Sequence, residues 1–245
     1  MSFLLRLHRS VPGPGYLLDI GANIGLISIP AALLLQPNGA GESRVRVVSV
    51  EAVADNAMAL RRNVALNNAE SLITVIERAL GERAGTVDIQ VEGDLAKGEG
   101  TGTANILPDG STLDPNRTYE CVRIPIQVST LDALLQSGEL APSCSVVKID
   151  TDGYDLRILQ GATCFIKASR PVMFGEFAAH CMNWHGQSVN DVVEFAKSMD
   201  YLVWQRLPRR KRFQFSRAVN AATFVQDLLL VPSEKAEALG WCLSG

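Results

Sequence analysis

A short turn rich in glycine holds the first residues that could do chemistry. It spans residues 19–25, follows a predicted strand over residues 16–20, and leads into a predicted helix over residues 24–35. Glycines in such a turn let the backbone approach a ligand closely, and the helix start offers unpaired N–H groups. The pattern therefore predicts a nucleotide-type cofactor site, with the candidate residues Asp19, Gly21, Ala22, Asn23 and Gly25.

The first position of this turn distinguishes two classes of cofactor. The dinucleotide fingerprint G-x-G-x-x-G would place its first glycine where Asp19 stands. A carboxylate there would repel a pyrophosphate, but it would suit a cationic amine such as that of a methionine moiety. The turn therefore favours S-adenosylmethionine over NAD. A nicotinamide-dependent oxidoreductase on a similar fold is the alternative, and a plain tight turn without a ligand is also open.

An acidic residue, Glu51, ends the next predicted strand, over residues 45–50. A carboxylate at this position can accept two hydrogen bonds from ribose hydroxyls. The interval from Gly25 to Glu51 is longer than the roughly 20 residues usual for this motif, and a polar loop over residues 36–43 accounts for the excess. We predict a ribose-binding role for Glu51; a solvated strand-end side chain is the alternative.

The most unusual stretch lies at residues 147–156, where charged Lys148 interrupts an apolar predicted strand. Side chains alternate along a strand, so Lys148 and Asp150 share one face. Three carboxylates, Asp150, Asp152 and Asp155, follow at the carboxyl end of that strand. Ligands bind at this edge in open α/β sheets.

Taken together, these motifs make residues 16–232 resemble the FkbM-type methyltransferases. That family carries a D-x-G-A-N-x-G turn, an acid after the second strand, a T-L-D segment, a K-I-D-x-E-G-x-E run and a later R-P…E strand. The corresponding segments here are residues 19–25, Glu51, residues 130–132, residues 148–155 and residues 170–176. Asp152 and Asp155 stand where the family has glutamates, which retracts each carboxylate by one methylene.

The resemblance implies methyl transfer from S-adenosylmethionine to a hydroxyl, often on a sugar or another small natural product. It also implies the residues of the cofactor pocket. These are Asp19, Gly21, Ala22, Asn23, Gly25, Glu51, Ala52 and Asp150, with Ala79 and Leu80 on the adenine side.

An alcohol becomes a good nucleophile only as its proton leaves, so a positioned base is expected to help. Our predicted catalytic residues are Asp150, Glu176 and His180, while Asp152 and His185 are further candidates for the base. No metal ligands are predicted, although a divalent metal held by Asp150, Asp152 and Glu176 is left open.

A basic cluster between the last two predicted strands includes Arg209, Arg210 and Arg212. We predict that it forms a rim that attracts an anionic or glycan-derived acceptor. A solvated loop is the alternative interpretation of such a charge run.

The elements that must position these residues alternate between strand and helix along the chain, and the predicted helices include residues 54–66 and 155–166. This alternation predicts a doubly wound α/β domain with a mostly parallel, seven-stranded, Rossmann-like sheet of the class I methyltransferase type. The last two predicted strands, residues 201–207 and 223–231, have no helical pattern between them and should form an antiparallel hairpin. We expect one domain over residues 1–245, with a short N-terminal segment at 1–15 and a long loop or lid at 93–118.

The composition limits the function classes. The net charge of −3 and the lack of a base-methylation motif argue against nucleic acid as a partner. None of the five cysteines stands in a C-x-x-C pair, which leaves a zinc site without ligand spacing. No apolar run suits a membrane span, so we expect a soluble, cytoplasmic enzyme with no stable membrane insertion. The altered acids keep a non-catalytic cofactor-binding module open, and the oligomeric state is undetermined.

Overall fold

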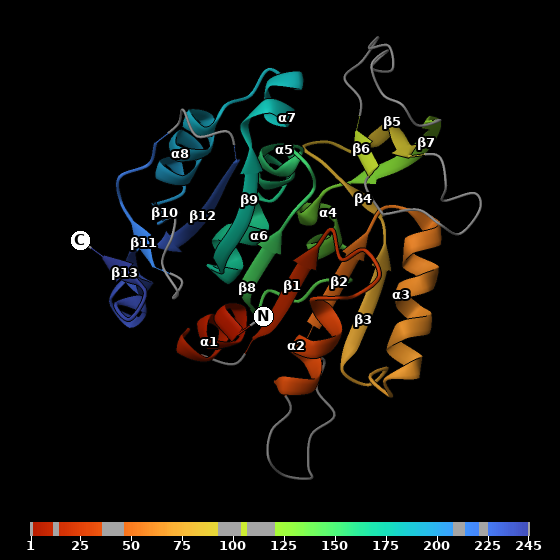
Figure 1. The fold of residues 1–245 in the computed structure, drawn as a ribbon, viewed down its shortest axis with the longest axis horizontal. Coiled ribbons are helices and arrows are strands. Elements are labelled where there is room, and N and C mark those ends of the chain that lie inside the picture. The colour runs from red at the N-terminus through yellow and green to blue at the C-terminus, as the bar shows by residue number, and fades with distance from the viewer. Residues whose placement is uncertain are drawn as a thin grey trace.

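The computed structural model describes residues 2–11, 15–35, 47–92, 104–106, 121–207, 214–220 and 225–244. Within these ranges the main sheet has nine strands in the order β13-β11-β10-β12-β9-β8-β1-β2-β3 (Figure 1). Their bounds are β1 Tyr16–Ile20, β2 Val47–Glu51, β3 Ile73–Glu77, β8 Cys144–Ile149, β9 Val172–Ala178, β10 Tyr201–Arg206, β11 Phe215–Ser216, β12 Val225–Pro232 and β13 Leu243–Ser244.

Strands β3, β2, β1, β8 and β9 run parallel, while β12 pairs antiparallel with both β9 and β10. The predicted mostly parallel sheet and its antiparallel C-terminal pair are therefore confirmed. The predicted number of seven strands needs a correction, because the two-residue strands β11 and β13 extend the edge beyond β10.

A second, smaller sheet has the order β4-β7-β5-β6 in the described residues. It is formed by β4 Ala79–Leu80, β5 Gly85–Glu92, β6 Ala104–Ile106 and β7 Cys121–Ser129. Figure 1 shows it beside the end of the main sheet at which the arrow of β1 points. Strand β6 falls within the predicted loop at 93–118, and the rest of that segment lies outside the described residues.

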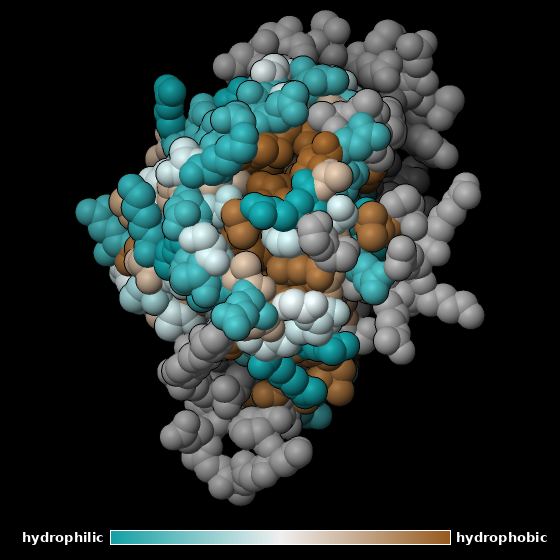
Figure 2. Space-filling model, turned by 90° about the vertical axis from the view of Figure 1, so that its left-hand side faces the viewer, coloured by the Kyte–Doolittle hydropathy of each residue, from teal (hydrophilic) through white to brown (hydrophobic). Residues whose placement is uncertain are grey.

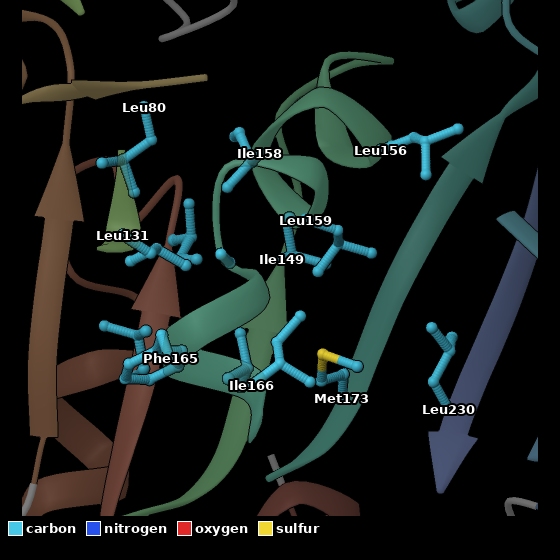
Figure 3. Close-up of a cluster of buried hydrophobic side chains, with 14 of the residues drawn as sticks. Leu80, Leu131, Ile149, Leu156, Ile158, Leu159, Phe165, Ile166, Met173 and Leu230 are labelled. Carbon is cyan, nitrogen blue, oxygen red and sulfur yellow. The ribbon is translucent and has the colours of Figure 1, made fainter. Parts of the chain in front are cut away.

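Helices cover both faces of the main sheet, as the doubly wound prediction requires. Apolar residues of α1, α2 and α3, such as Leu7, Ala31 and Leu60, belong to one buried cluster. Residues of α4, α5, α6 and α8 belong to another, part of which is drawn in Figure 3. The helices are α1 Ser2–Ser10, α2 Ser28–Leu34, α3 Ala54–Leu66, α4 Leu131–Gln136, α5 Asp155–Gln160, α6 Thr163–Ser169, α7 Ala179–Trp184 and α8 Val189–Ser198, and the 3-10 turns η2 Ser233–Lys235 and η3 Glu237–Leu239 follow β12.

Alternation along β1 decides which side chains each cluster receives. Leu18 and Ile20 enter the cluster under α4 to α8, whereas Leu17 enters the one under α1 to α3. Asp19 shares the face of Leu17 because side chains two residues apart point the same way. The first acid of the motif is therefore directed beneath α2.

Two predicted helices differ from the structure. The helix expected at 24–35 begins at Ser28, so Pro30 falls in its first turn, where a missing N–H costs little. The helix expected at 155–166 is interrupted at Gly161, the C-cap of α5, where a Cβ would lie 2.1 Å from the carbonyl oxygen of Gly81. A helix resumes at Thr163.

The surface of the protein visible in Figure 2 is mostly hydrophilic, as expected when most apolar side chains are buried. On the side of the molecule seen in Figure 2, hydrophilic residues surround a limited apolar area. Among the helices of the described ranges, none combines the length and the apolar character needed to cross a membrane.

Candidate cofactor site

A cavity of about 660 Å³ lies at the carboxyl ends of β1, β2 and β8. Its wall is built from the turns that follow these strands, from the segment after β3, and from residues of β5, β6 and α5. The lining residues are Ile20, Gly21, Ala22, Asn23, Ile24, Leu26, Ile27, Val50, Glu51, Ala52, Val53, Arg78, Ala79, Leu80, Ile89, Ile106, Lys148, Asp150, Thr151, Asp152, Tyr154 and Ile158. Most of the predicted cofactor residues thus lie together around one space.

The glycine turn after β1 forms the floor of this cavity, and its shape is fixed by contacts inside the protein. Gly21 has a φ of +74°, and a Cβ on it would lie 2.1 Å from the carbonyl oxygen of Asp150. Gly25 has a φ of +93° and does not line the cavity; a Cβ there would lie 2.5 Å from Leu60. We expected these glycines to give room to a ligand, but the structure shows that packing within the fold already requires them.

Glu51 lies on the wall beside the turn and is only 6% exposed. Its Oε2 accepts the backbone N–H of Asn23 at 2.7 Å, and its Oε1 accepts that of Val53 at 3.0 Å and the Asn56 amide at 3.4 Å. Asn23 has a φ of +51°, a left-handed conformation that asparagine tolerates better than most residues. The carboxylate therefore joins the β1 turn to the β2 end.

Asp19 lies beneath the cavity and does not line it, which corrects its predicted place. Its side chain is fully buried, because β1 alternation directs it toward α2. The Ser28 hydroxyl donates to Asp19 Oδ2 at 2.5 Å, and Lys148 Nζ lies 3.2 Å from Oδ1. We predicted a ligand amine as the cation beside Asp19; in this structure the cation is Lys148.

Lys148 connects this buried acid to the cavity wall. Its Nζ donates to the carbonyl oxygen of Gly21 at 3.0 Å and lies 3.5 Å from Asp150 Oδ2. Burial alone would lower the pKa of Lys148, but the charges of Asp19 and Asp150 raise it above its ordinary value. The ammonium therefore stays protonated, and it holds the turn and Asp150 together.

The loop after β8 supplies Asp150, Thr151 and Asp152 to the wall. Asp155, the first residue of α5, is fully buried and accepts the N–H of Thr151 at 3.0 Å, the Thr151 hydroxyl at 2.9 Å and the N–H of Gly153 at 3.0 Å. Burial raises the pKa of Asp155 to about 6, against the opposing effect of these hydrogen bonds. Asp155 therefore shapes the wall without lining the cavity.

The apolar part of the wall comes from elements that the motifs do not reveal. Ala79 and Leu80 of β4 line it as the resemblance implies, and Ile89 of β5 and Ile106 of β6 add the small sheet to it. Tyr154 lines it from the turn before α5. Sequence reasoning missed Ile89 and Ile106 because it did not predict the sheet that places them; Tyr154 could have been found from its position directly after the Asp150–Gly153 loop.

Of the predicted catalytic residues, the structure brings Asp150 to the cavity wall but not Glu176 or His180. Glu176 lies opposite Asp227 on the neighbouring strand β12, and its pKa is raised by burial and by the charges of Asp150, Asp227 and Asp152. His180 lies in α7, where its Nε2 is 3.2 Å from the sulfur of Cys181. Glu176 belongs to β9 and His180 to α7, and neither side chain lines the cavity.

Two further expectations concern the acceptor side. Arg209, Arg210 and Arg212 fall at 208–213, outside the described residues, so their predicted rim stays a prediction. Within the part of the chain that the structure describes, no three His, Cys, Asp or Glu side chains are grouped to hold a metal ion. Asp150, Asp152 and Glu176 therefore do not form the metal site that was left open.

The sequence of this chain matches the model of one known protein family. The family model described as "Methyltransferase FkbM domain" matches residues 19–214, well over half of the sequence. The chain belongs to the FkbM methyltransferase family. The match begins at Asp19 and includes the glycine turn, Glu51 and the Lys148–Asp155 run.

Solved structures with similar chain paths are methyltransferases of low sequence identity. The FkbM methyltransferase from Methylobacillus flagellatus KT is 16% identical with a TM-score of 0.49; the match covers 92% of this chain and 50% of that one. Precorrin-6y C5,15-methyltransferase from Geobacter metallireducens GS-15 is 17% identical (TM-score 0.46, 94% and 85% covered). Magnesium protoporphyrin IX methyltransferase from Synechocystis PCC 6803, with bound SAM, is 12% identical (0.47, 94% and 76%).

This FkbM chain thus spans half the length of the M. flagellatus protein. No curated protein sequence matches it. Its membership of the family rests on the domain match.

Proposed function

We propose that this FkbM-family protein transfers a methyl group from S-adenosylmethionine to a hydroxyl of a small molecule, such as a sugar or another natural product. The observation that carries the proposal is the buried Glu51 carboxylate on the wall of a cavity beside the β1 turn. The cavity of about 660 Å³ falls within the range usual for small-molecule sites.

The residues present fit such a cofactor. A carboxylate has about four acceptor sites, and the three donors that reach Glu51 leave room for a ribose hydroxyl. Beside it, Leu80, Ile89 and Ile106 form an apolar surface suited to a flat base. Because Lys148 already neutralises Asp19, the half-exposed carboxylate of Asp150 is the group that can meet a cationic amine at the floor.

When bound, S-adenosylmethionine supplies the electrophilic methyl group. The wall residues would then hold the acceptor hydroxyl in line with that methyl group, which is the main contribution of positioning. Asp150 is our candidate for the proton acceptor, since its half-exposed carboxylate lines the cavity. A positioned base of this kind increases the reaction rate by roughly 10²–10⁴-fold.

The first experiment measures cofactor binding by calorimetry, with S-adenosylhomocysteine and NAD as the ligands. We expect S-adenosylhomocysteine to bind and NAD not to bind. Replacing Glu51 by Ala should weaken binding by about 1.5–3 kcal/mol, the range for hydrogen bonds to a charged group. Binding of NAD in its place would overturn the cofactor assignment, and unchanged affinity would remove Glu51 from the site.

A matched control is Glu77, which ends the neighbouring strand β3 in register with Glu51. Glu77 pairs with Arg61 at the surface and does not line the cavity. Replacing Glu77 by Ala should leave binding of S-adenosylhomocysteine unchanged. Transfer of a labelled methyl group to a panel of hydroxylated sugars and phenols then tests the acceptor class, and transfer only to amines or thiols would contradict O-methylation.

A further inference from the structure

The loop between β8 and α5, residues 150–154, contributes to the cavity wall with an irregular backbone. Asp152 has a φ of +51° and Gly153 a φ of +99°. A Cβ on Gly153 would lie 2.4 Å from the Cβ of Cys181, so α7 packs directly against the loop. Without other restraints, a chain of this shape would readily adopt other conformations.

Two sets of hydrogen bonds hold this loop at its ends. At the start, the Asp150 N–H donates to the carbonyl oxygen of Ile20 at 3.2 Å, which continues the β1–β8 pairing. At the end, both oxygens of Asp155 accept donors from the loop, namely two from Thr151 and one from Gly153. Asp155 therefore fixes the residues on both sides of Asp152.

Burying this carboxylate has a large desolvation cost, because Asp155 is fully buried. A packed apolar side chain would fill the same position of α5 without that cost. The three hydrogen bonds offset it, and all three lead to the loop and none to another part of the protein. What the acid contributes is thus the shape of the wall.

We propose that Asp155 is a positioning residue that holds Asp150, Thr151 and Asp152 in place on the cavity wall. The inference rests on the proposed function in so far as the cavity is taken to bind S-adenosylmethionine. It goes beyond that function because Asp155 does not line the cavity.

The chain offers a matched control in Asp132. Its carboxylate accepts the same set of donors, the N–H groups of Cys164 and Phe165 and the Thr163 hydroxyl, at the start of α6. Asp132 does not line the cavity, and neither do its three donors. Loss of either carboxylate removes two hydrogen bonds from backbone N–H groups and one from a threonine hydroxyl. Only the bonds to Asp155 hold a loop that lines the cavity.

The test compares Asp155→Asn with Asp132→Asn in the full chain without ligand, by NMR of the backbone amides. We expect Asp155→Asn to shift the Thr151 and Gly153 amide signals and speed their hydrogen exchange at least tenfold, because asparagine places a donor against a donor. Asp132→Asn should do the same at Cys164 and Phe165 and leave Thr151 and Gly153 unchanged. Unchanged exchange at Thr151 and Gly153 in Asp155→Asn would overturn the proposal.

Affinity for S-adenosylhomocysteine supplies the second readout. Asp155→Asn should weaken binding by roughly tenfold, and Asp132→Asn by less than twofold; equal weakening by both variants would refute a specific positioning role. If the unmodified protein binds no S-adenosylhomocysteine, the proposed function fails, and the exchange data alone decide the role of Asp155.

A second variant keeps the proposal testable if Asp155→Asn does not fold. Thr151→Val removes only the hydroxyl donor and should still speed amide hydrogen exchange at position 151; no change there would overturn the proposal.

Discussion

Replacing Lys148 by methionine would remove the ammonium that lies between Asp19 and the cavity floor. The side chain of Asp19 is fully buried, and its contacts in the described structure are the Ser28 hydroxyl at 2.5 Å and Lys148 at 3.2 Å. Methionine keeps an unbranched side chain that is one atom shorter, but it leaves Asp19 charged and without a counter-ion. The same change also removes the donor to the Gly21 carbonyl oxygen.

The expected magnitude follows from the distance of this ion pair. At 3.2 Å and an effective dielectric constant of 20, the attraction between Asp19 and Lys148 is about 5 kcal/mol before desolvation is subtracted. Removing one partner of a buried pair costs about 3–5 kcal/mol, because the other charge stays buried. We therefore expect Lys148→Met to lower the free energy of unfolding by about 3–5 kcal/mol.

Urea denaturation followed by circular dichroism measures this loss of stability. The comparison requires that the m-value, the slope of the free energy of unfolding against urea concentration, is unchanged. The double variant Asp19→Asn with Lys148→Met should be more stable than Lys148→Met alone by about 1–3 kcal/mol, since no unpaired charge remains. Lys197→Met serves as a control, because Lys197 pairs with Glu194 at the surface and should cost less than about 0.5 kcal/mol. A loss below about 1 kcal/mol for Lys148→Met, or no coupling in the cycle, would refute the reasoning.

Two further predictions concern the floor and the acid stability. Gly21→Ala should cost about 2–5 kcal/mol by thermal denaturation, because a positive φ is combined with a Cβ 2.1 Å from the Asp150 carbonyl oxygen; Gly138→Ala, with a φ of +80° and open space around it, should cost only about 1 kcal/mol. Burial, aided by the charge of Arg157, lowers the pKa of His185 from 6.5 to about 4, so its neutral form favours the fold and that contribution is lost as the pH falls below 6.5. From pH 7 to pH 5 the protein should lose about 1 kcal/mol more stability than His185→Gln, after allowance for solvent screening, and equal losses in urea titrations would contradict this.

Much of the fold could be predicted because the buried strands are short apolar runs with a helix between them. The strand at residues 16–20 and the helix at 54–66 have the predicted bounds, and Glu51 and Asp150, at the carboxyl ends of their strands, both line the cavity. The resemblance to the FkbM family is confirmed by the domain match.

What could not be predicted depends on contacts between residues distant in sequence. The carbonyl of Gly81 leaves no room for a Cβ at position 161, and the wall positions of Ile89 and Ile106 depend on the pairing of a separate sheet. The orientation of the Asp19 side chain could have been predicted, because strand alternation places it on the same face as Leu17. The glycine motif instead suggested that Asp19 faces a ligand at the end of the strand.

The ties between Gly21, Asp150, Lys148 and Glu51 also bear on the thermodynamics of recognition. Because these groups are connected through the protein's own hydrogen bonds and ion pairs, the floor of the cavity is already ordered before a ligand arrives. A ligand that docks on such a floor loses little affinity to ordering of the protein chain. Binding enthalpy gained there would then be offset mainly by the ligand's own loss of torsional freedom.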